Sequence, residues 1–159
     1  MALAAVLTAA LCSPAAAEER IEGPLGAEVL EVIDGDTLLV RARIWLGLDV
    51  TVSVRLRGID APERRGRCED ERRLAERARE HLSDLVAGGA VVLTDIGRDK
   101  YAGRVIAEVA DGAGARLAPG LVAAGLARPY DGAGRGVWCA QVPDPEDAAP
   151  RKSAARTAD

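Results

Sequence analysis

Residues 54–63, VRLRGIDAPE, set an arginine, an aspartate and a glutamate around the end of a predicted strand. Apolar and polar residues alternate before this end, so we expect Arg55 on the face opposite the apolar row. Asp60 and Glu63 follow in a turn that Pro62 stiffens. A guanidinium matches two phosphate oxygens, and carboxylates can hold a hard cation or position a water molecule. The run therefore indicates metal-assisted hydrolysis of a phosphodiester.

A second group of carboxylates lies in the tripeptide Asp34-Gly35-Asp36, just before a strand-like run at 37–45. Asp36 begins this strand and Asp60 closes the next one, so in a meander both side chains can reach the same end of the sheet. Two carboxylates, carbonyl oxygens and water suit a hard cation such as calcium. Taken alone, the tripeptide is better explained by a hairpin turn, where Asp and Gly are favoured for backbone reasons, and only the other motifs favour a metal site.

The elements that must position these residues follow from hydrophobic periodicity. Besides the strand of the opening run, strands are predicted at 26–33, 37–45, 90–96 and 104–109, and helices at 67–86 and 119–126. Three strands, a helix, two strands and a further helix predict an α+β fold. Its expected form is a five-stranded OB-fold Greek-key barrel with two packed helices.

The composition is that of one domain with an aliphatic core. The chain has 159 residues, 48% of them hydrophobic, but only 3% are aromatic and none is Phe. The formal net charge of −4 is unusual for a nucleic-acid-binding protein. Because such affinity comes largely from neutralised phosphates, we expect weak, salt-sensitive binding that depends on local groups of arginines around the motifs.

The two ends of the chain differ from this domain. Residues 1–17 are predicted to be a signal peptide, because an apolar stretch too short to span a bilayer ends in Ala15-Ala16-Ala17. No Lys or Arg precedes Arg20, and a lipoprotein signal through Cys12 is an alternative. We expect a polar lead-in at 18–25, the domain at 26–140, and a disordered tail at 141–159. The expected localisation is secreted or periplasmic, with no stable membrane insertion.

Removal of the signal peptide leaves two cysteines, Cys68 and Cys139. An even number in an oxidising compartment predicts a disulfide, with two free thiols as the alternative. The bond would close a loop of about 70 residues and contribute on the order of 4 kcal/mol in the chain-entropy model.

Three motifs in this order, VIDGDTLLV, VRLRGIDAPE and DKYAGRVIAEV, resemble the staphylococcal nuclease family, also called thermonuclease-like, over roughly residues 26–130. The resemblance implies the same OB-type barrel. It also implies that calcium is the cofactor, bound by Asp36, Asp60 and the backbone carbonyl of Ala61.

The same resemblance assigns the chemistry. Arg55 and Arg104 are expected to hold the phosphate, and Glu63 is expected to position the water or act as general base. The third motif reads Tyr101-Ala102-Gly103-Arg104, one residue longer than the Tyr-Gly-Arg common in the family. We expect Gly103 to absorb the extra residue as a bulge, which would keep Arg104 aimed at the phosphate.

Three further residues are candidates for substrate binding. Lys100 and Tyr101 resemble family residues that contact a terminal phosphate. Tyr130 could stack on a base. For Tyr130, and equally for Trp138, the alternative is packing in the core or at its rim.

The function implied is that of a monomeric nuclease with little sequence specificity. It would hydrolyse DNA, with RNA as a second candidate substrate, and leave 3′-phosphates. The alternative is a non-catalytic OB-fold module that binds nucleic acid or a protein partner.

Overall fold

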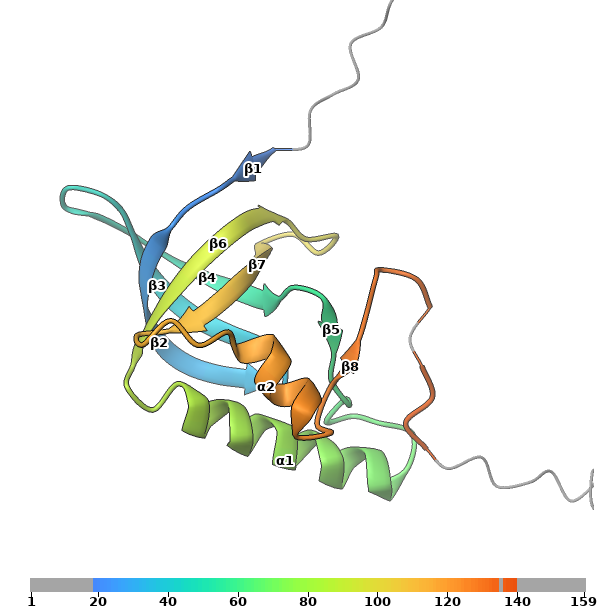
Figure 1. Cartoon of the computed structure of the whole chain (residues 1–159). Helices are drawn as coiled ribbons and strands as arrows, with labels where there is room; N and C mark the ends of the chain where they lie inside the picture. The colour runs from blue at the N-terminus through green and yellow to red at the C-terminus, as the bar shows by residue number, and fades with distance from the viewer. Residues whose placement is uncertain (1–18, 135, 140–159) are drawn as a thin grey trace, which may run out of the picture.

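Five strands close into a mixed barrel in the computed structural model, which describes residues 19–134 and 136–139 (Figure 1). The barrel closes because β6 pairs with both β2 and β7, and every pairing within it is antiparallel except that of β4 with β7. Its strands are β2 (Leu25–Asp34), β3 (Thr37–Trp45), β4 (Leu48–Leu56), β6 (Ala90–Arg98) and β7 (Arg104–Asp111). With two helices packed on it, the predicted α+β fold of OB type is confirmed. The predicted signal peptide and the predicted tail at 141–159 lie outside the described residues.

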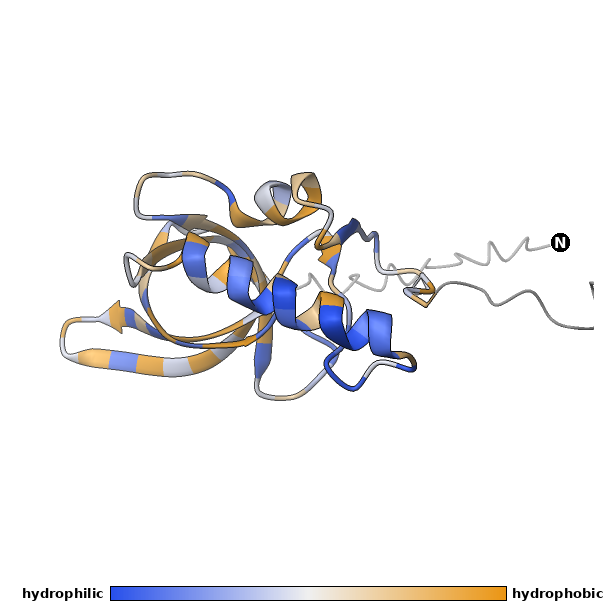
Figure 2. Cartoon of the chain, turned by 90° about the horizontal axis from the view of Figure 1, so that it is seen from below, coloured by the Kyte–Doolittle hydropathy of each residue, from blue (hydrophilic) through white to orange (hydrophobic). Residues whose placement is uncertain are grey.

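Helix α1 (Glu69–Leu85) runs across the open lower end of the barrel. It buries Ala75, Ala78 and Leu82 at helical spacing, whereas its outward face is hydrophilic (Figure 2). The helix begins two residues later than predicted because Cys68, with φ −131° and ψ 164°, is still extended. Its buried stripe seals one end of the core.

Helix α2 (Leu117–Ala123) is short and buries Leu117 and Leu121. It begins two residues before the predicted start at Pro119. The proline still falls in the first turn, where its missing N–H costs no helical hydrogen bond. The core between the helices and the barrel is aliphatic, as predicted: every buried member is Leu, Val, Ile or Ala.

Three strands of two residues each were not predicted, because so short a segment carries no periodic signal. Strand β1 (Arg20–Ile21) pairs with β6, so part of the predicted polar lead-in belongs to the sheet. Strands β5 (Ile59–Asp60) and β8 (Arg128–Pro129) pair with each other beside the barrel. This small ladder fixes the backbone of Asp60 against the chain that follows α2.

The β3–β4 hairpin extends beyond its neighbours at the end of the barrel opposite to β5 and β8 (Figure 1). Strand β2 covers β3 only as far as Ala42, and β7 pairs with β4 only from Ser53 onward. Apolar side chains at the tip are therefore exposed, with Trp45 at 73% and Leu46 at 91%.

The sulfur atoms of Cys68 and Cys139 are joined in the structure, with their α-carbons 5.9 Å apart. Cys68 is the N-cap of α1, whereas Cys139 closes the last described segment. The pair therefore attaches residues 136–139 to the start of the helix, as the sequence predicts.

Loss of this bond is expected to lower the free energy of unfolding by on the order of 4 kcal/mol, because the unfolded chain regains the entropy of an open loop. Urea unfolding of the wild type with and without reductant measures the difference, and a Cys68→Ser/Cys139→Ser variant serves as the control that reductant leaves unchanged. A non-reducing peptide map that finds two free thiols in the untreated protein would contradict the bond.

Candidate active site

Antiparallel pairing of β3 with β4 brings Asp36 and Arg55 together. Thr37 is the register partner of Arg55, and the backbone N–H of Leu56 donates to the carbonyl of Asp36 over 2.8 Å. Asp36 is thus held at the turn that begins β3, beside the last residues of β4. The predicted meander of antiparallel strands therefore brings Asp36 and Arg55 together.

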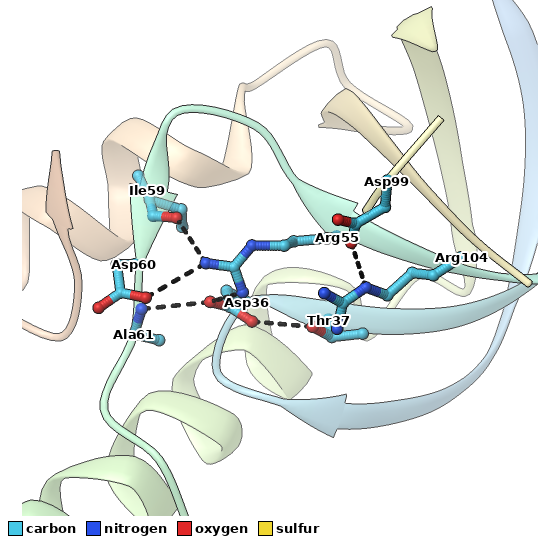
Figure 3. Close-up of polar contacts among 8 residues, drawn as sticks. All are labelled: Asp36, Thr37, Arg55, Ile59, Asp60, Ala61, Asp99 and Arg104. Carbon is cyan, nitrogen blue, oxygen red and sulfur yellow. Dashed lines mark hydrogen bonds and ion pairs between the residues drawn. The ribbon is translucent and has the colours of Figure 1, made fainter. Parts of the chain in front are cut away.

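Arg55 is the centre of a buried ion-pair network (Figure 3). Its Nη1 lies 2.6 Å from Oδ2 of Asp36, and its Nη2 lies 3.2 Å from Oδ1 of Asp60. The same Nη2 donates to the carbonyl of Ile59 over 3.1 Å. All three charged side chains are at most 8% exposed. Arg55 is therefore not a surface cation on a polar strand face but a bridge between two buried carboxylates.

Asp36 accepts two further hydrogen bonds. The hydroxyl of Thr37 donates to Oδ1 over 2.8 Å, and the backbone N–H of Ala61 donates to Oδ2 over 3.2 Å. The second bond ties the turn before β3 to the segment after β5. Two buried carboxylates share one buried guanidinium here, so the cluster carries an excess of negative charge.

Gly35 allows α1 to approach this turn. A β-carbon at this position would lie 2.6 Å from Cβ of Ala78 and 3.1 Å from Cβ of Ala61. The contact with Ala78 is too close for any β-carbon, and the contact with Ala61 is tight, so packing against the helix requires the glycine between the two aspartates. Asp34-Gly35-Asp36 therefore forms the turn between β2 and β3 and also contributes both aspartates to the pocket lining.

A pocket of about 290 Å³ opens over this network. Six of the residues predicted for the site line it: Asp36, Arg55, Ala61, Glu63, Tyr101 and Arg104. Asp60 is not in this lining, although it reaches the pocket's floor through Arg55. Lys100 is exposed and Tyr130 is half-buried after β8, and neither lines the pocket.

Comparison with protein-family models places residues 53–149, more than half of the chain, in the family described as staphylococcal nuclease homologues. The chain belongs to the staphylococcal nuclease family. The matched region contains Arg55, Asp60, Glu63 and Arg104, whereas Asp36 lies before it and is connected through Arg55. No match to the chain was found among curated proteins.

Within the described part of the chain, neither helix has the length and apolar character needed to cross a membrane.

Arg104, the second arginine expected from the family, begins β7 and points into the same pocket from the other side. Its Nε pairs with the carboxylate of Asp99, and its guanidinium lies 4.7 Å from the ring centre of Tyr101. Sequence reasoning missed Asp99, although it stands at the head of the third family motif. Asp99 fixes the direction of the Arg104 side chain.

The extra residue of the third motif lies in a turn, so the predicted bulge at Gly103 is wrong. Gly103 has φ +79°, and the N–H of Arg104 donates to the carbonyl of Tyr101 over 3.3 Å. Glycine adopts this left-handed conformation without steric cost. The turn absorbs the addition before β7 begins, and the strand's register is unaffected. The bulge lies instead in β6, where the register shifts between Thr94 and Gly97.

Asp34 adds to the negative charge of the pocket. Burial raises the pKa of this half-buried carboxyl above its ordinary value, and the charge of Asp36 raises it further, against the attraction of three arginines. The negative charge of Asp34 is thus unfavourable where it lies, beside Asp36. The sequence marks Asp34 as part of the turn, and the structure shows that it also lines the pocket.

The donor set fits calcium, the cofactor expected from the family, by its chemistry. Asp36 and Asp60 supply hard carboxylate oxygens, and their combined charge exceeds that of Arg55. Among the described residues, the one group of three side-chain ligand atoms within 4.8 Å of one another is Cys68, Glu71 and Cys139. Its cysteines are joined as a disulfide, which leaves Glu71 alone to bind a cation there. The two aspartates are therefore the better candidates.

Removal of the guanidinium is expected to destabilise the protein strongly. In an Arg55→Met variant, two buried carboxylates lose their shared partner, which should lower the free energy of unfolding by about 3–5 kcal/mol. Chemical denaturation measures this loss. Arg77→Met, on the exposed face of α1, is the control and should change it by less than about 0.5 kcal/mol. Equal effects of the two substitutions would show that the network contributes little.

Proposed function

We propose that this member of the staphylococcal nuclease family is a metal-dependent endonuclease that hydrolyses phosphodiester bonds. The observation that carries the proposal is the convergence of Arg55, Arg104 and Glu63 on one pocket above two buried aspartates. A pocket with two guanidiniums and a carboxylate suits a phosphodiester anion and a water molecule.

The arginines act on the phosphate. Arg55 and Arg104 approach the pocket from β4 and β7, which are adjacent parallel strands. Arg104 can donate two parallel hydrogen bonds to phosphate oxygens through its Nη atoms, and Arg55 has donors beyond those used by Asp36, Asp60 and Ile59. The pair neutralises the charge that grows on these oxygens in the five-coordinate transition state. The contacts to Asp36, Asp60 and Asp99 hold both groups in place beforehand, which reduces the cost of reorganisation.

Glu63 acts on the water. Its exposed carboxylate lies at the rim of the pocket and follows Pro62, whose ring restricts the backbone before it. From this position it accepts a proton from the attacking water or orients that water towards phosphorus. Calcium, when bound at the aspartates, would supply additional positive charge for the phosphate and for the developing nucleophile.

The finer properties of the proposal come from the family resemblance. The substrate is DNA, with RNA as a second substrate, sequence specificity is low, and the products carry 3′-phosphates. Lys100, Tyr101 and Tyr130 are the proposed substrate contacts. The protein works as a monomer, secreted or in the periplasm, after cleavage of residues 1–17.

Digestion of heat-denatured DNA tests the activity. The wild type is expected to degrade the DNA with calcium and to leave it intact with chelator. Glu63→Gln, which removes the proton acceptor but retains the shape, should lower the rate by about 10²–10⁴-fold. Arg55→Lys keeps the charge but loses the planar fork, and a loss of about 10²–10³-fold is expected.

Matched controls lie on the exposed face of α1, where Glu80→Gln and Arg77→Lys should leave the rate unchanged. Thermal unfolding of each variant confirms that it is folded. If the wild type binds single-stranded DNA but leaves it intact with calcium, the enzyme proposal is lost and the binding-module alternative is supported.

Calcium should also stabilise the folded protein without any substrate, because a ligand that binds only the native state shifts unfolding by mass action. At a concentration one hundred times the dissociation constant, the gain is about 2.7 kcal/mol. Differential scanning calorimetry with calcium and with chelator should show a higher Tm for the wild type and no shift for Asp36→Asn. Asp131→Asn, in an exposed loop, should retain the shift. An equal response of both variants would remove Asp36 from the metal site.

A further inference from the structure

A second pocket, of about 640 Å³, adjoins the candidate active site. Glu63 lines both pockets, so the two meet at the proposed water-positioning residue. One wall is the loop after Glu63, including Arg65 and Arg67, and the other is the disulfide-linked segment with Val137, Trp138 and Cys139. Any chain that leaves the catalytic pocket past Glu63 enters this space.

The wall opposite the loop is held in place by several contacts. The guanidinium of Arg128 lies 3.8 Å from the ring centre of Trp138 and donates to the carbonyl of Val137 over 2.8 Å. Arg128 is itself the β8 partner of Asp60, and the disulfide fixes the far end of the segment to Cys68. These contacts join the wall to β8 and to the start of α1.

The charges of the loop point to an anionic ligand. Most arginines of the described chain pair with a carboxylate, as Arg55, Arg79 and Arg104 do. The exposed side chains of Arg65 and Arg67 have no partner among the described residues. The lining also holds the carboxylates of Asp60, Glu63 and Glu71. Asp60 is paired with Arg55 and Glu71 accepts the backbone N–H of Arg67, whereas the guanidiniums of Arg65 and Arg67 are available to an anionic ligand.

A further donor in this pocket lacks an acceptor. The indole nitrogen of Trp138 is buried and makes no hydrogen bond within the described residues. A donor that is buried without an acceptor lowers the stability of this wall. The carboxylate of Glu71, which lies on the pocket's floor, is occupied by the backbone N–H of Arg67 over 2.9 Å.

We propose that this second pocket is a subsite for the polynucleotide strand flanking the scissile phosphate, with Arg65 and Arg67 contacting its backbone. The inference rests on the proposed nuclease function and extends it to the substrate class: a chain of several nucleotides rather than an isolated phosphodiester. Contacts with the phosphate backbone of the polynucleotide raise the affinity without making it depend on the base sequence. They also let a nuclease with a negative net charge bind its negatively charged substrate through local positive charges.

Kinetics on two substrates test the subsite. For heat-denatured DNA, Arg65→Ala/Arg67→Ala should raise KM by about tenfold and leave kcat unchanged, because the contacts lie away from the reacting bond. For a chromogenic phosphodiester that contains a single nucleoside, both parameters should remain those of the wild type. Arg77→Ala is the matched control, since Arg77 is also exposed and unpaired among the described residues but lies on α1 away from both pockets.

Binding gives a readout that needs no cleavage. Fluorescence anisotropy with a labelled thymidine 20-mer should show about tenfold weaker binding for the double variant, with a slope of log affinity against log salt reduced by about 1.4 for two lost phosphate contacts. Equal KM changes on the two substrates, or a double variant that binds and cleaves DNA as Arg77→Ala does, would overturn the subsite alone. A wild type that binds the 20-mer but cleaves neither substrate would overturn the nuclease proposal, and the anisotropy of the variants would then still decide the subsite.

Discussion

The position of Arg55 between two buried carboxylates is the interaction on which this end of the molecule depends. Asp36 and Asp60 are far apart in the sequence, and their charges would repel each other inside the fold without the guanidinium at 2.6 Å and 3.2 Å. The network holds two carboxylates for one guanidinium. A structure that buries such an excess is prepared for a cation, and the same guanidinium lies beside the pocket where a phosphate would bind.

The surrounding fold holds this network from three directions. The β3–β4 register places Asp36 against Arg55, and Gly35 lets α1 pack onto the turn that carries Asp36. The β5–β8 ladder holds Asp60 from the other side. The backbone of each charged residue is thus held by residues distant in the chain, and the ion pairs hold the side chains. The side-chain entropy is therefore lost when the protein folds and need not be lost again when a ligand binds.

Much of this arrangement could be predicted from the sequence. Alternation in β3 and the apolar stripe of α1 fixed their bounds within two residues, and the three motifs predicted the fold and family that the structure and the family match confirm. The partners of the arginines could not be predicted. Asp99 and β8 have no periodic or compositional signal, because their roles arise only when the barrel closes. The conformation of Gly103 was also inaccessible, since a turn and a bulge can absorb one residue equally well in sequence terms.

The link between Cys68 and Cys139 has a consequence for the order of maturation. The barrel and the Arg55 network are complete without it, because neither contains a cysteine. The wall of the second pocket is held only in part without it: Arg128 contacts Val137 and Trp138, but the covalent attachment of Cys139 to the start of α1 is this bond. A chain that has folded under reducing conditions therefore has Asp36, Arg55 and Asp60 in place before Cys139 is joined to α1, and oxidation becomes the final step of assembly.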